Sequence, residues 1–187
     1  MQFPNSGSGR PYVRLDARTG SFKASTPEGS PVLVDMKGKV LDLDLENAKQ
    51  GWLSVDQQGV NFVPLKNRDD WIGTPQPSND HAPAVSLDLM SDAFAEPRVR
   101  EFRGNSRAVT TFIANVASEA GEIPAGKAVR VRIKAVRQIN VGRGTSIDLE
   151  FDLAPQDKWP DLSAFDAHRD VPAQPTTQPP TQDDDWA

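Results

Sequence analysis

Residues 128–137 read Ala-Val-Arg-Val-Arg-Ile-Lys-Ala-Val-Arg, in which apolar and basic side chains alternate strictly from Val129 to Ala135. Side chains on a strand point alternately to the two faces of a sheet, so this stretch has one apolar and one cationic face. Residues 147–153 read Ile-Asp-Leu-Glu-Phe-Asp-Leu and repeat the pattern with acidic side chains. Joined by a turn at residues 142–144, the two stretches predict a pair of long neighbouring strands.

The rest of the chain shows the same strand pattern in shorter segments. Residues 52–55 and 60–63 flank a turn that contains Gly59, which indicates a hairpin. The 16 prolines and 13 glycines favour strands and tight turns over long helices. We therefore predict an all-β fold with minor helical content, including a short helix after Pro160. Further strands are expected at residues 13–17, 32–34, 41–45, 85–89 and 108–117.

The length of 187 residues predicts a single folded domain, which we place at residues 10–170. Residues 1–9 are expected to be a flexible leader. Residues 171–187 are expected to be a disordered linker and acidic tail, because residues 172–182 contain one apolar side chain besides prolines and cannot form a core.

Charge is distributed unevenly along the chain. The net charge is −5, yet residues 97–143 carry ten basic and three acidic side chains, and residues 144–187 carry two basic and ten acidic ones. Eight of the ten cations in residues 97–143 are arginines, whose planar guanidinium suits phosphate oxygens and stacks on flat bases. The sequence leaves two interpretations open. The basic row either forms a binding surface or is neutralised across the sheet by the acidic row.

The composition argues against several kinds of chemistry. There is no cysteine, and the two histidines do not suggest a catalytic triad or a metal site. The carboxylates at residues 42, 44 and 46 follow strand alternation. We therefore predict a protein that is not an enzyme and that has no cofactor, metal or catalytic residue. Without an apolar stretch of about 18 residues, it is expected to lie in the cytoplasm and not in a membrane.

The combination of arginines and aromatic residues points to single-stranded nucleic acid. Proteins that bind single strands track the phosphates with cations and stack the bases on aromatic rings. Each aromatic residue also has an alternative role in the core. The predicted stacking residues are Trp52, Phe62, Trp71 and Phe102, and the predicted cations are Arg103, Arg107, Arg130, Arg132, Lys134, Arg137 and Arg143.

The C-terminus supplies a resemblance to a known family. A spacer rich in Pro, Gln and Thr leads to Asp183, Asp184, Asp185 and Trp186, and this arrangement resembles the tail of single-stranded DNA-binding proteins from bacteria and their phages. The resemblance implies an OB-fold-like Greek-key barrel of five or somewhat more strands. It also implies an acidic tail that recruits partner proteins and competes with DNA.

The leading prediction is a protein that coats single-stranded DNA without sequence specificity during phage DNA replication, recombination or repair. Its partners would be single-stranded DNA and, through the tail, replication and recombination proteins. A phage-encoded protein would act in the host cytoplasm, and homo-oligomers are compatible with this function. The alternatives are a β-rich virion structural or assembly protein and a carboxylate-dependent enzyme.

Overall fold

The computed structural model describes residues 10–26, 30–56, 59–67, 69–142 and 144–169. Within these ranges the strands are β1 Tyr12–Leu15, β2 Phe22–Ala24, β3 Val32–Val34, β4 Val40–Leu43, β5 Lys49–Asp56, β6 Gly59–Pro64, β7 Ala82–Met90, β8 Val99–Gly104, β9 Val129–Val141 and β10 Gly144–Leu153. The helical segments are α1 Arg107–Ala120, the 3-10 turn η1 Gln156–Lys158 and α2 Ser163–Asp166.

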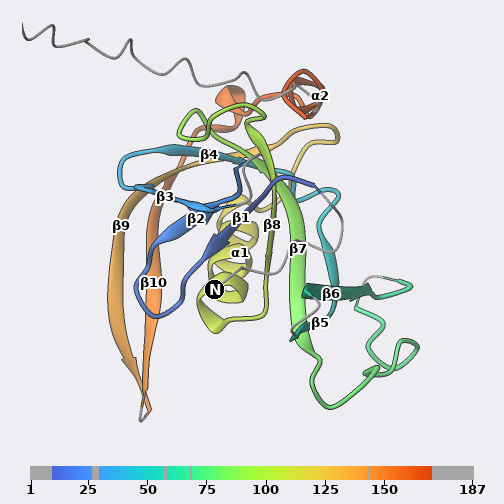
Figure 1. The fold of residues 1–187 in the computed structure, drawn as a ribbon. Coiled ribbons are helices and arrows are strands. Elements are labelled where there is room, and N and C mark those ends of the chain that lie inside the picture. Colours follow the sequence, from blue (N-terminus) through green and yellow to red (C-terminus); the bar gives the residue numbers. More distant parts are fainter. Residues whose placement is uncertain (1–9, 27–29, 57–58, 68, 143, 170–187) are drawn as a thin grey trace, which may run out of the picture.

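The strands form one sheet that curls strongly into a half-barrel (Figure 1). Its main path runs in the order β10-β9-β4-β7-β8-β1-β2-β3, and the β5–β6 hairpin branches from β7. Strand β1 runs parallel to β8, although most neighbouring strands are antiparallel. The prediction of a mainly β protein with a barrel-like sheet is confirmed, and the ten strands exceed the five or so expected.

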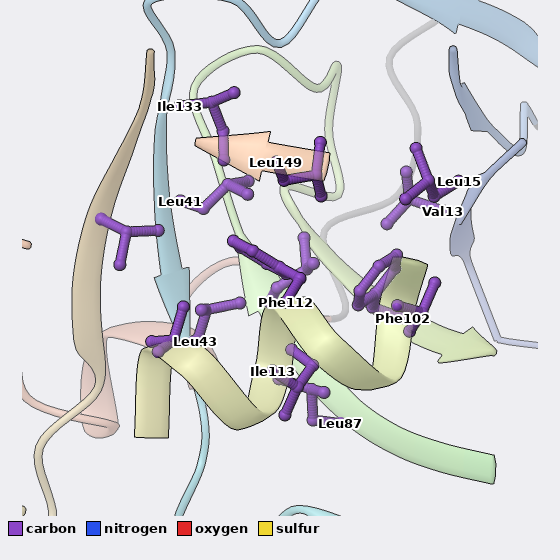
Figure 2. Packing of buried hydrophobic residues seen from close by; sticks show 14 of the residues in the cluster. Val13, Leu15, Leu41, Leu43, Leu87, Phe102, Phe112, Ile113, Ile133 and Leu149 are labelled. Carbon is purple, nitrogen blue, oxygen red and sulfur yellow. The ribbon is translucent and has the colours of Figure 1, made fainter. Parts of the chain in front are cut away.

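Helix α1 lies inside the curl of the sheet and forms the centre of the main core (Figure 1). Figure 2 shows Phe112 and Ile113 of this helix among apolar side chains of the strands, including Leu43, Leu87 and Phe102. Burying a side chain of this size contributes about 1.5–3 kcal/mol to folding. This core holds strands from both halves of the chain together, and it determines which side chains remain on the outer face.

The predicted strand at residues 108–117 is wrong, because these residues belong to helix α1. Buried side chains recur every three or four positions, which is the helical period and not the strand period. The Ser106 hydroxyl accepts a hydrogen bond from the Val109 N–H and caps the helix N-terminus, and Gly121 ends it with a φ of 64°. The buried helical residues are Ala108, Val109, Phe112, Ile113 and Val116.

The predicted short helix after Pro160 is confirmed as α2. Its Phe165 packs with Val99 and Ala128 in a separate small cluster at the outer face of the sheet. Among the residues that the structure describes, no helix is long and apolar enough to cross a membrane.

Candidate nucleic-acid interface

The predicted basic row of β9 lies on the outer face of the sheet. Val129, Val131 and Ile133 point into the core, so the cations between them point away from α1. Arg130 donates from Nε to Oδ1 of Asp42 at 2.7 Å and from Nη2 to Oδ2 at 3.0 Å. This hydrogen bonding raises the pKa of Arg130 above its ordinary value. Because the Asp42 carboxylate is buried, Arg130 is a structural counter-ion.

The acidic row of β10 lies on the same face as the basic row. The register places Arg132 opposite Asp152. Lys134 Nζ lies 3.1 Å from Asp152 Oδ1, and Arg137 Nη2 lies 3.0 Å from Glu150 Oε2. Three of the four predicted cations of β9 are therefore paired with carboxylates instead of forming an open basic surface. Arg132 is exposed and makes no ion pair within the described part of the chain.

The predicted stacking role of Phe102 is wrong, because its side chain is completely buried. Phe102 stacks on Phe22 with ring centroids 6.3 Å apart, inside the half-barrel. Strand alternation explains the error. On β8 the charged neighbours Glu101 and Arg103 point to the outer face, so Phe102 between them points to the core.

Trp52 and Trp71 meet on one face of the β5–β6 hairpin. Their ring centroids lie 5.0 Å apart at an angle of 84°, and Trp52 Nε1 donates to the Thr74 carbonyl at 2.7 Å. Both side chains are half-buried. Phe62 lies on the opposite face of the hairpin, because it pairs with Leu53 and not with Trp52. The structure therefore separates the two tryptophans from Phe62.

Phe62 and Arg103 come together on the outer face of the sheet. The Arg103 guanidinium carbon lies 4.8 Å from the centre of the Phe62 ring, which is a cation–π geometry. Arg103 Nη2 also donates to Glu101 Oε1, which accepts a further hydrogen bond from the Ser86 hydroxyl at 3.2 Å. The buried Glu101 carboxylate thus orients the Arg103 guanidinium. The Phe62 side chain is half-buried.

A second arginine–aromatic pair, which the sequence did not single out, lies on the neighbouring strand β1. The Arg14 guanidinium carbon lies 4.7 Å from the centre of the Tyr12 ring. Tyr12 pairs with Glu101 in the parallel register between β1 and β8, so this pair is beside the first one. Burial lowers the pKa of Arg14 below its ordinary value, and the positive charge of Arg103 lowers it further. The Tyr12 ring is buried, so it holds Arg14 in place and does not offer a face for stacking. We call Tyr12, Arg14, Phe62 and Arg103 the arginine–aromatic surface.

Two cavities adjoin this surface, and both have Glu101 and Arg103 in their walls. The first, which we call the β1–β8 cavity, has a volume of about 150 Å³. Its polar lining includes Arg14, Asn105 and Ser106. The second has a volume of about 270 Å³, and its lining residues include Arg10, Lys49, Phe62 and Arg169. The two hollows share Glu101 and Arg103 and therefore lie next to each other.

The remaining predicted residues are more distant or lie outside the described ranges. Arg107 is exposed at the first turn of α1, next to Ser106 in the wall of the β1–β8 cavity. Arg143 and the predicted tail residues Asp183, Asp184, Asp185 and Trp186 lie outside the described residues. The structure therefore brings together Phe62 and Arg103 from the predicted set, and it adds Tyr12 and Arg14.

Comparison with known proteins gives no relative from which a role could be transferred. No protein-family model matches the chain, and neither the curated proteins nor the solved structures contain a significant match.

Proposed function

We propose that this protein binds single-stranded DNA without sequence specificity, through the arginine–aromatic surface. The observation that carries the proposal is the placement of two guanidinium groups over two aromatic rings beside two cavities on one face. Single-strand binding needs cations for the phosphates and flat rings for the bases, and stacking contributes about 1–3 kcal/mol per base. Of the two rings, Phe62 is the half-buried one that could contact a base, because Tyr12 is buried. The proposal keeps the predicted function of binding single-stranded DNA. It places the main contacts on β1, β6 and β8 instead of on β9.

The chemistry of the surface favours a strand over a simple anion. An arginine held against an aromatic ring has its orientation fixed before a phosphate binds. Arg103 already donates to Glu101, so Arg14 is the main phosphate contact in this proposal. The charged wall of the β1–β8 cavity contains two arginines, Arg14 and Arg103, and one carboxylate, Glu101, so it carries a net positive charge. Apolar walls beside these charges suit a ligand that alternates flat bases with phosphates.

The proposal is tested by fluorescence anisotropy with labelled oligo(dT) and the full-length protein. We expect saturable binding at 50 mM salt that weakens steeply towards 200 mM. A single strand contacted at about three phosphates gives a slope near −2 in a plot of log affinity against log salt concentration. A duplex of the same length is the control and should bind more weakly. No binding to oligo(dT) at 50 mM salt, or a flat salt dependence, would refute the proposal.

The C-terminal tail belongs to the same proposal as a partner-binding and competing segment. Its three carboxylates are joined to the folded part by a linker, so they act at a high effective concentration. Deleting residues 172–187 is expected to tighten binding to oligo(dT). An unchanged or weaker affinity would remove the competing role of the tail without affecting the arginine–aromatic surface.

One observation favours the alternative of a β-rich structural or assembly protein. Strand β3 forms the end of the sheet path, and its Val32 and Leu33 are 51% and 71% exposed. Exposed apolar edge strands are a common site of pairing between chains. Light scattering in the absence of DNA separates the two functions. An assembly protein is expected to form large oligomers, and the substitution Leu33→Lys is expected to dissociate them.

A further inference from the structure

The β1–β8 cavity has the dimensions and the walls of a pocket for one aromatic ring. Its volume of about 150 Å³ is the same as that of a cavity known in another protein to hold a benzene molecule. The apolar part of the wall comes from β1, β5, β6 and α1, and the charged part comes from β1 and β8. The apolar lining residues include Leu53, Val55, Val60 and Val109.

We infer that this cavity binds a single pyrimidine base of the DNA strand, an inference that rests on the proposed function and refines it. A pyrimidine always presents a carbonyl oxygen to the two guanidinium groups of the polar wall, whereas adenine presents none. The inference therefore adds a base-class preference to a surface that otherwise contacts the strand without reading its sequence.

The polar wall suits the edge and the phosphate of a pyrimidine nucleotide. Guanidinium groups only donate hydrogen bonds, and pyrimidines present carbonyl oxygens, which only accept them. Arg14 and Arg103 line the cavity together and can serve both a base carbonyl and the adjoining phosphate. Glu101 is already engaged by Arg103 and Ser86, so the donors dominate the polar wall.

Mononucleotides test the pocket without the stacking differences that complicate longer strands. The full-length protein, labelled with ¹⁵N, is titrated separately with dTMP, dAMP and deoxyribose 5-phosphate. The backbone amides of Asn105, Ser106 and Val109 are followed by NMR. We expect dTMP to shift these amides and to bind about tenfold more tightly than either of the other two compounds. Equal binding of deoxyribose 5-phosphate would show a simple anion site and overturn the inference, as would equal binding of dAMP.

A matched pair of variants connects the cavity with strand binding. Asn105 is exposed at the wall of the cavity, so Asn105→Trp obstructs it, and Ser118→Trp adds the same bulk at an exposed position near the end of α1. Asn105→Trp is expected to lose the dTMP shifts and to weaken oligo(dT) binding about tenfold, whereas Ser118→Trp behaves as the wild type. Wild-type binding by Asn105→Trp refutes the pocket but leaves the proposed function intact. Absence of oligo(dT) binding by the wild type refutes the proposed function itself.

Discussion

Arginines on two parts of the same sheet have different surroundings. On β9, Arg130 pairs with Asp42, its register partner on β4, and Arg137 pairs with Glu150 of β10. On β1 and β8, Arg14 and Arg103 lie over aromatic rings and line a common cavity, and Arg103 also pairs with the buried Glu101. The number of basic residues in a stretch of sequence therefore does not identify a binding surface. The neighbours that the fold supplies determine whether each charge is available.

The largest expected effect separates the two phenylalanines that the sequence predicts as stacking residues. Phe102→Ala should lower the free energy of unfolding by about 4 kcal/mol, because it opens a cavity in the core. Phe62→Ala should cost about 1 kcal/mol, because this side chain is only half-buried. Urea denaturation measures both. Similar losses for the two variants would contradict the assignment of Phe102 to the core and Phe62 to the surface.

The next effect separates two arginines that are two residues apart on β9. Arg130→Ala should lower the free energy of unfolding by about 3 kcal/mol, because it leaves the buried Asp42 carboxylate without its counter-ion. Arg132→Ala should change it by less than about 0.5 kcal/mol, because its side chain is exposed. The same denaturation experiment tests this pair. A small loss for Arg130→Ala would show that Arg130 is not a structural counter-ion.

The smallest effect concerns the exposed pair between Lys134 and Asp152. Both side chains are more than half exposed, so a double-mutant cycle should give a coupling energy of about 0.2–1 kcal/mol that decreases with added salt. A coupling above about 2 kcal/mol would mean that the β9–β10 pairs stabilise the fold much more than their exposure indicates.

Local patterns in the sequence predicted much of the sheet but not its long-range contacts. The alternation at residues 128–137 and 147–153 correctly gave β9 and β10, and the turn at Gly59 gave the β5–β6 hairpin. Residues 108–117 were misassigned because the apolar spacing was interpreted with the strand period, although Ser106 and Gly121 are typical helix-capping residues. All of these predictions, right or wrong, depend on residues that are close together in the sequence.

The candidate site depends on a contact that no local pattern contains. Tyr12 and Glu101 are partners in a parallel register, although 88 residues lie between them in the sequence. The alternation within each strand does not show that the two strands are neighbours. The basic stretch therefore directed attention to β9, where the cations are mostly neutralised. The signal that was present in the sequence is Arg14, which alternates with the buried Val13 and Leu15 and so had to lie on the outer face.

The most direct test compares the two groups of arginines in one binding experiment. Wild-type protein, Arg14→Gln and Arg137→Gln are titrated against labelled oligo(dT) at 50 mM salt, after circular dichroism has shown that all three are folded. Arg14→Gln is expected to bind about tenfold more weakly, and Arg137→Gln should remain within about twofold of the wild type. If Arg137→Gln weakens binding and Arg14→Gln does not, single-stranded DNA binds to β9 and the arginine–aromatic surface is not the interface.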